Sequence, residues 1–182
     1  NQIKGFGGYG FPESHSASFA LLAYVSAWLK CHHPAAFYVG LLNSQPMGFY
    51  SPSQLIQDAR RHHIMVLPID VNHSSWDHQI LSSADQQQPP IRLGLRLIKG
   101  LSEAAGQRIH TAQRQRAFAN VADLRQRACL DRGDMEALAA ADALSGISGN
   151  RYQSHWQTMA LEAHRPLLPH DGAAQRSQDD AV

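Results

Sequence analysis

A glycine-rich turn near the start of the chain runs directly into an apolar helix. The turn occupies residues 7–12 (GGYGFP), and Ser14, His15 and Ser16 follow it. Small residues let the backbone approach a ligand, and the first amides of a helix have no partner within it. Those amides and the helix dipole favour an anion, and a hydroxyl and an imidazole add donors. The pattern predicts a phosphate contact at Ser14 and His15, with simple helix capping as the alternative.

A second candidate phosphate site lies at Lys99, Gly100, Leu101 and Ser102. A basic residue, a glycine, an apolar residue and a small residue that opens a helix are typical of a helix-hairpin-helix DNA-binding element. The glycine permits a tight turn, and Leu101 anchors this turn in the core. The amides after Ser102 can hold a backbone phosphate, while Lys99 and Arg108 supply positive charge. Such contacts read no bases, so we expect binding that is sensitive to salt and independent of sequence.

Two features qualify this hairpin. The usual hairpin has a second glycine where Ser102 stands, so an ordinary helical turn remains an alternative. A second hairpin, with a poorer fit, is indicated around residues 130–133. The local charge favours DNA, because residues 91–133 hold nine basic and three acidic side chains, a net charge of +6, whereas the whole chain carries +1.

Prolines, caps and hydrophobic periodicity predict the elements that position these residues. A helix capped at Ser14 or Ser16 is expected to end near Cys31, before residues 32–34 (HHP). Apolar residues lie on nearly every side of this helix, so it needs neighbours that enclose it. The further helices are expected over residues 35–42, 52–62, 103–111, 121–128, 133–140 and 149–161, and short strands at 64–68, 80–81 and 91–95. These elements predict a mainly α fold with a small β element.

The cysteines and histidines show no metal-binding pattern. Cys31 precedes His32 and His33, but adjacent helical residues point about 100° apart, and a structural zinc site needs four converging ligands. We therefore expect neither metal ligands nor catalytic residues in this chain. The two cysteines are far apart and predict no disulfide, and Cys129 is expected to be a small core residue.

Composition and length exclude a membrane-spanning protein. The apolar run at residues 17–29 is too short to cross a bilayer, and no signal peptide opens the chain. We therefore expect a cytoplasmic protein. The chain begins at Asn1, without methionine, and reads as a fragment of a longer protein.

The two phosphate-site candidates, in this order, resemble the bacterial family C DNA polymerases, the family of the alpha subunit of polymerase III. Residues 9–22 (YGFPESHSASFALL) are similar to a signature in the fingers region, and residues 30–37 (KCHHPAAF) continue it. The proline-glutamate form of the first segment, with residues 42–50 (LNSQPMGFY), looks like the error-prone, damage-inducible paralogue. Residues 91–151 resemble the tandem helix-hairpin-helix domain that follows the fingers.

The resemblance implies template-directed addition of deoxynucleotides to a primer, with translesion synthesis during DNA repair in the error-prone branch. In the family, the fingers hold the triphosphate of the incoming nucleotide, and Ser14 and His15 match those positions. The helix-hairpin-helix domain grips duplex DNA, and residues 99–102 match its first hairpin. The implied partners are the primer-template duplex and a deoxynucleoside triphosphate. Other mutagenesis or replication proteins are further candidate partners, and no membrane is implied.

The resemblance also divides the chain and leaves catalysis elsewhere. It implies the end of the fingers at residues 1–63, a short β connector with a loop at 64–97 and the tandem helix-hairpin-helix domain at 98–161. The tail at 162–182 lacks apolar periodicity, and we expect it to be disordered. Nucleotidyl transfer needs paired carboxylates that hold two magnesium ions, and the family's aspartates lie in an upstream palm domain. We therefore expect Mg²⁺ in the parent polymerase and no activity from this fragment alone. The alternatives are a free-standing DNA-binding module without sequence specificity, over about 91–161, and a scaffold for protein contacts.

Overall fold

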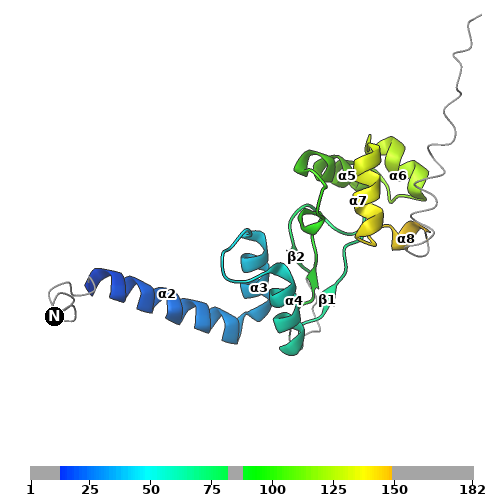
Figure 1. The fold of residues 1–182 in the computed structure, drawn as a ribbon. Helices are drawn as coiled ribbons and strands as arrows, with labels where there is room; N and C mark the ends of the chain where they lie inside the picture. The colour runs from blue at the N-terminus through cyan, green and yellow to red at the C-terminus, as the bar shows by residue number, and fades with distance from the viewer. Residues whose placement is uncertain (1–12, 82–87, 149–182) are drawn as a thin grey trace, which may run out of the picture.

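The computed structural model describes residues 13–81 and 88–148, and helices dominate these two ranges (Figure 1). A small sheet connects the first helices to the last ones, which confirms the expected mainly α fold with a small β element. The elements are α2 (Glu13–His32), α3 (Pro34–Asn43), α4 (Pro52–Arg61), β1 (Val66–Leu67), β2 (Gln79–Ile80), β3 (Ile91–Arg92), the 3-10 helix η1 (Leu95–Leu97), α5 (Glu103–Gln115), α6 (Val121–Arg127), α7 (Arg132–Ala140) and α8 (Ser145–Ser148).

Helix α2 projects from the rest of the molecule as a long rod, and its C-terminal end meets α3 (Figure 1). Phe19, Leu22 and Tyr24 are more than half exposed along it. Its apolar character therefore does not come from packing against the described part of this chain. Helix α2 thus has apolar residues on nearly every side, as expected. The described residues do not supply the neighbours that would enclose it.

Local sequence signals set the bounds of α3 and α4. Pro34 occupies the first position of α3, where its missing amide costs no hydrogen bond. Ser51 caps α4 by accepting from the Gln54 amide at 3.3 Å, while the Gln54 side chain accepts from the Ser51 amide at 2.9 Å. This reciprocal capping box satisfies two amides that the helix leaves unpaired. Helix α4 ends at Arg61, and the chain turns away from it through His63, a left-handed residue with φ 60°.

The sheet has three short strands in the order β1-β3-β2. Strand β1 runs parallel to β3, with Val66 opposite Ile91, and β2 runs antiparallel to β3, with Ile80 opposite Ile91. Each strand has two residues, fewer than the sequence predicts at 64–68 and 91–95. Ile91 is fully buried, so this central position anchors the sheet beneath α3 and α4.

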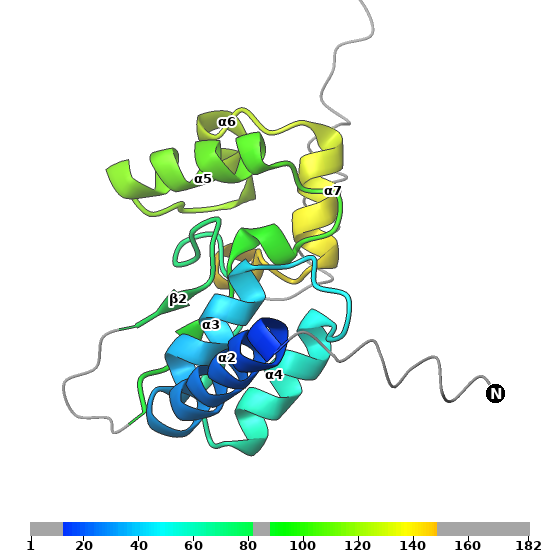
Figure 2. The same cartoon turned by 90° about the vertical axis from the view of Figure 1, so that its left-hand side faces the viewer.

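One buried cluster joins the helices before the sheet to those after it. Leu42 of α3 and Leu55 of α4 belong to the same cluster as Val71, Leu95 and Leu138. Figure 2 shows α3 and α4 on one side of the strands and α5, α6 and α7 on the other. Helix α5 extends to Gln115, beyond the expected residue 111, and α8 was not expected. The helix expected at 149–161 and the tail lie outside the described residues.

Candidate nucleic-acid interface

The first hairpin forms an exposed turn on a buried base. Ile98 and Leu101 are 5% and 7% exposed, whereas Lys99 and Gly100 between them are exposed. Gly100 has φ +91°, a conformation that other residues rarely adopt, and a Cβ there would meet only Ala137, at 3.9 Å. The glycine is therefore needed for the backbone conformation rather than for space. The element before the turn is the single 3-10 turn η1 rather than a full α-helix.

Ser102 opens α5 directly after this turn. Its Oγ accepts from the Ala105 amide at 3.1 Å, and the residue itself is exposed. The preceding amides of the first turn point along the helix axis and lack intrahelical acceptors. Lys99, Gly100 and Ser102 thus share one solvent-facing turn, which is the arrangement that an anion at a helix N-terminus requires.

The second hairpin repeats the backbone geometry of the first. Cys129 has a left-handed φ of 49°, Leu130 is 5% exposed, and Asp131 caps α7 by accepting from the Asp134 amide at 2.8 Å. The Leu130 amide donates to the Arg125 carbonyl at 3.1 Å and closes the end of α6. This closure places Leu130 in the core. Cys129 is left on the surface, so its expected core position is wrong.

Arg108 lies between the two hairpins. Its Nε donates to the Ala128 carbonyl at 2.9 Å, and its Nη2 lies 3.4 Å from both the Cys129 carbonyl and Oδ2 of Asp134. The side chain, which remains 42% exposed, therefore links α5 to the turn between α6 and α7. Its backbone partners belong to the second hairpin. The sequence predicts Arg108 only as a positive charge beside the first hairpin, because these partners lie 20 and 21 residues away.

The positive charge of residues 91–133 is only partly free to meet a ligand. Arg96 pairs with Asp77 at 2.7 Å, and Arg116 and Arg127 share Asp123 at 2.9 and 3.3 Å. The Ala119 amide and then Arg127 lower the pKa of Asp123. Within the described ranges, the cations of this stretch that have no hydrogen-bond or ion-pair partner are Lys99, Arg114 and Arg125.

The predicted nucleotide site is only partly described. The turn at residues 7–12 and the side chain of Ser14 lie outside the described part of the structure. His15 is exposed in the first turn of α2, and its ring meets the ring of Phe19 edge-on, with the centroids 4.5 Å apart. The structure therefore places His15 near the far end of the projecting helix.

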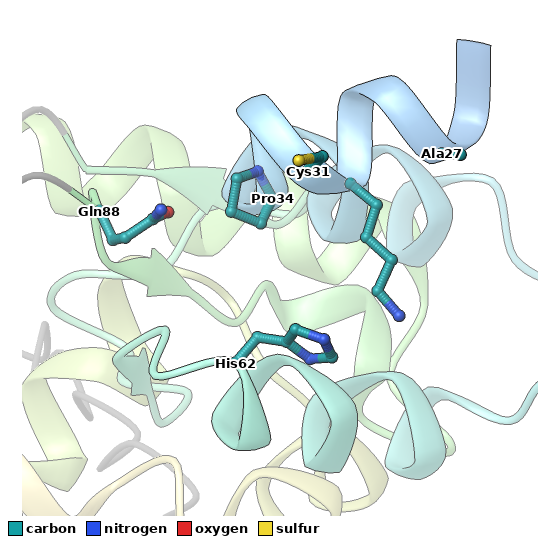
Figure 3. Close-up of a pocket in the computed structure, with 6 residues that line it drawn as sticks. Ala27, Cys31, Pro34, His62 and Gln88 are labelled. Atoms are coloured by element: carbon teal, nitrogen blue, oxygen red, sulfur yellow. The ribbon is translucent and has the colours of Figure 1, made fainter. Parts of the chain in front are cut away.

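A cleft of about 420 Å³ lies where the C-terminal end of α2 meets α4, with Cys31, Pro34 and His62 among its lining residues (Figure 3). Next to it, Asp58 accepts from Tyr38 Oη at 2.6 Å and Lys30 Nζ at 2.8 Å. The hydrogen bond from Lys30 lowers the pKa of Asp58, while burial raises that of Tyr38. These contacts hold α2 against α3 and α4.

Neither a metal cluster nor a membrane span is found in the described residues. No group of three or more histidine, cysteine, aspartate or glutamate side chains comes together in residues 13–81 and 88–148. The described residues therefore do not fit a two-metal centre. None of the helices in these ranges combines the length and apolar character that a bilayer span requires.

Comparison with known proteins shows the family to which this chain is related. A family model for the helix-hairpin-helix motif matches residues 63–154. The chain is 58% identical over 183 residues to an error-prone DNA polymerase of Methylococcus capsulatus, with 91% of this chain and 18% of that protein covered. It is 59% identical to that of Saccharophagus degradans, over 100% of this chain and 18% of the relative, and 60% identical to that of Teredinibacter turnerae, over 92% and 16%.

The chain thus spans less than a fifth of the length of the curated relatives it matches. The matched segment contains both hairpins described above, and the family model covers the sheet and helices α5 to α8. The chain belongs to the helix-hairpin-helix family and corresponds, over its length, to one segment of the error-prone DNA polymerases.

Proposed function

We propose that this chain is the DNA-contacting segment of an error-prone DNA polymerase that adds deoxynucleotides across damaged template. The observation that carries the proposal is the first hairpin: an exposed turn at Lys99 and Gly100, anchored by buried Leu101, that opens α5 at Ser102. The relatives of 58 to 60% identity, all error-prone DNA polymerases, support the activity of the longer protein.

The first hairpin would act on the DNA backbone. The first-turn amides of α5 and the Ser102 hydroxyl can donate to phosphate oxygens, and Lys99 adds an unpaired charge. Gly100 gives the turn its shape, and Leu101 fixes it to the core. Arg108 contributes positive charge and holds the second hairpin against α5. None of these groups reads a base edge, so the grip suits duplex DNA of any sequence.

The remaining assignments follow the same proposal. Residues 1–63 would be the end of the fingers, with Ser14 and His15 on the incoming triphosphate, and residues 98–161 the tandem helix-hairpin-helix domain. The connector would be residues 64–97, and the tail 162–182. Magnesium would be held elsewhere in the polymerase, which we place in the cytoplasm. The chain's own residues then bind and orient DNA and nucleotide, and they activate no group.

Duplex binding at two or more salt concentrations tests the hairpin. Lys99→Ala should weaken binding of blunt duplex DNA by about 5- to 10-fold for all sequences, and it should reduce the slope of log K against log salt by about 1. Arg61→Gln, which removes an exposed charge at the end of α4, is the matched control and should have a smaller effect. An unchanged affinity and salt slope for Lys99→Ala would contradict the proposal. In the intact polymerase, the double variant Ser14→Ala, His15→Ala should raise the nucleotide KM.

A further inference from the structure

A second cleft of about 420 Å³ lies beside the first hairpin. Its walls come from the loop between α3 and α4 (Gln45, Pro46), from the segment before β2 (Trp76, His78) and from η1 (Arg96). Leu97 also lines it, two residues before Lys99. The cleft is within the size range of small-ligand sites, and it combines apolar walls with a few polar groups, as such sites do.

His78 brings an unused hydrogen-bond donor to this cleft. The residue is 3% exposed, and its Nδ1 accepts from the Gly94 amide at 3.0 Å. A neutral imidazole that accepts at Nδ1 carries its proton on Nε2. Nε2 has no hydrogen-bond partner in the described part of the chain. It is also not fully buried, so a ligand can reach it. Because His78 lines the cleft, its Nε2–H is available to a ligand bound there.

The neighbouring side chains suit a flat, partly polar ligand. The six-membered ring of Trp76 lies against the bare backbone of Gly106, where an added Cβ would be 2.4 Å from Cε3, so the indole is held in place. Arg96 is 27% exposed in its side chain and carries a positive charge at the rim, paired with Asp77. The Gln45 amide is already used by Met47 and Tyr50, so Gln45 serves as wall.

We propose that this cleft binds an unpaired DNA base next to the duplex held at the first hairpin. The base ring would lie against Trp76 and Pro46, a base carbonyl or ring nitrogen would accept from His78 Nε2–H, and an adjoining phosphate would lie near Arg96. Stacking on an aromatic side chain, with one hydrogen bond to a base edge, is a general way to hold an unstacked base. This inference rests on the proposed duplex binding at Lys99.

Burial, with a smaller contribution from Arg96, lowers the pKa of His78 to about 4. At neutral pH the ring is therefore uncharged and keeps the tautomer that the Gly94 contact requires. A neutral donor suits a base, whereas a phosphate would favour a cation. The charged part of the ligand is left to Arg96, on the open side of the cleft.

Three labelled duplexes test the inference with the chain as it stands: blunt, with a three-nucleotide overhang, and with the same overhang made abasic. The overhang with bases should bind at least 5-fold more tightly than the abasic one, and it should shift the Nε2 resonance of His78. Arg96→Gln should weaken the binding of both overhangs relative to the blunt duplex, because both carry the phosphate, whereas Arg61→Gln should change the three affinities little. A free deoxynucleoside monophosphate should shift His78 only at much higher concentration.

The outcomes separate this inference from the proposed function. Equal affinity for the two overhangs, with His78 unmoved and the effect of Lys99→Ala intact, overturns the cleft assignment alone. If a free nucleotide shifts the His78 resonance at the same concentration as the overhang, the claim that the bound base belongs to a DNA strand is overturned. If the wild-type chain binds none of the three duplexes, both proposals are overturned.

Discussion

The side-chain amide of Asn72 pairs with both backbone polar groups of Phe118. Its Oδ1 accepts from the Phe118 amide at 2.7 Å, and its Nδ2 donates to the Phe118 carbonyl at 3.1 Å. Asn43 makes the same pair of bonds with His78, at 2.9 and 3.1 Å. Each asparagine side chain thus bonds to the backbone amide and carbonyl of a distant residue, as a neighbouring β-strand would. The first pair ties the turn after β1 to the loop between α5 and α6.

Asn72→Ala should lower the free energy of unfolding by about 2 to 4 kcal/mol, because two partly buried backbone groups lose their partners. Urea unfolding followed by circular dichroism measures this loss. Gln57→Ala, at an exposed site on α4, serves as the control and should change the stability by less than about 0.5 kcal/mol. A loss for Asn72→Ala no larger than this control would show that the pair contributes little.

Gly94 has no room for a side chain. An added Cβ would lie 2.4 Å from the Asp77 carbonyl carbon and from the Trp76 carbonyl oxygen, and backbone atoms cannot rotate away. We expect Gly94→Ala to destabilise the fold by about 3 kcal/mol or more. Gly40→Ala on α3 meets nothing within 4 Å and should stabilise by about 0.5 to 1 kcal/mol. Thermal unfolding of the two variants should therefore shift in opposite directions.

The turns of the two hairpins predict a second pair of opposite effects. Gly100 has φ +91° and Cys129 has φ 49°. Gly100→Ala should cost about 1 kcal/mol through backbone strain, whereas Cys129→Gly should relieve strain and stabilise by a few tenths to about 1 kcal/mol. Differential scanning calorimetry of both variants checks the signs. A destabilised Cys129→Gly would mean that the thiol makes a contribution that outweighs the strain.

Acid should weaken the fold through His78. Its pKa in the folded chain is lowered to about 4, first by burial and then by Arg96, with Asp77 opposing. The unfolded chain therefore takes up this proton first as the pH falls, and stability is lost from about pH 6.5 down to about 4. The loss should reach about 3 kcal/mol by pH 4. An NMR titration in which the His78 ring protonates near 6.5 would contradict this window.

Local signals predicted the helices well, because capping and proline act on neighbouring residues. Ser51 and Pro52 begin α4 as expected, and Pro34 begins α3. The turn of the first hairpin also follows from short-range pattern, since Gly100 has the turn conformation and Leu101 the buried position that the pattern predicts. The strands at 64–68 and 91–95 proved shorter, because their pairing depends on partners far along the chain.

Long-range contacts could not be read from the sequence. Cysteine is not a residue type that signals a left-handed turn, and it is usually a core residue. The exposed left-handed position of Cys129 was therefore not predicted. Arg108 joins a charged stretch in the sequence, but its carbonyl partners at Ala128 and Cys129 appear only once α5 and α6 are packed. The unused donor of His78 likewise depends on the Gly94 amide, 16 residues away.

The buried cluster that joins Leu42 and Leu55 to Leu138 limits how this segment can be subdivided. A piece trimmed to residues 91–161 would keep both hairpins. It would lose three elements that pack into the same core: α3, α4 and the turn at Val71. Each Å² of apolar surface uncovered in this way costs about 25 cal/mol. The orientation of the two hairpin turns is thus set partly by helices that contribute no residue to either turn.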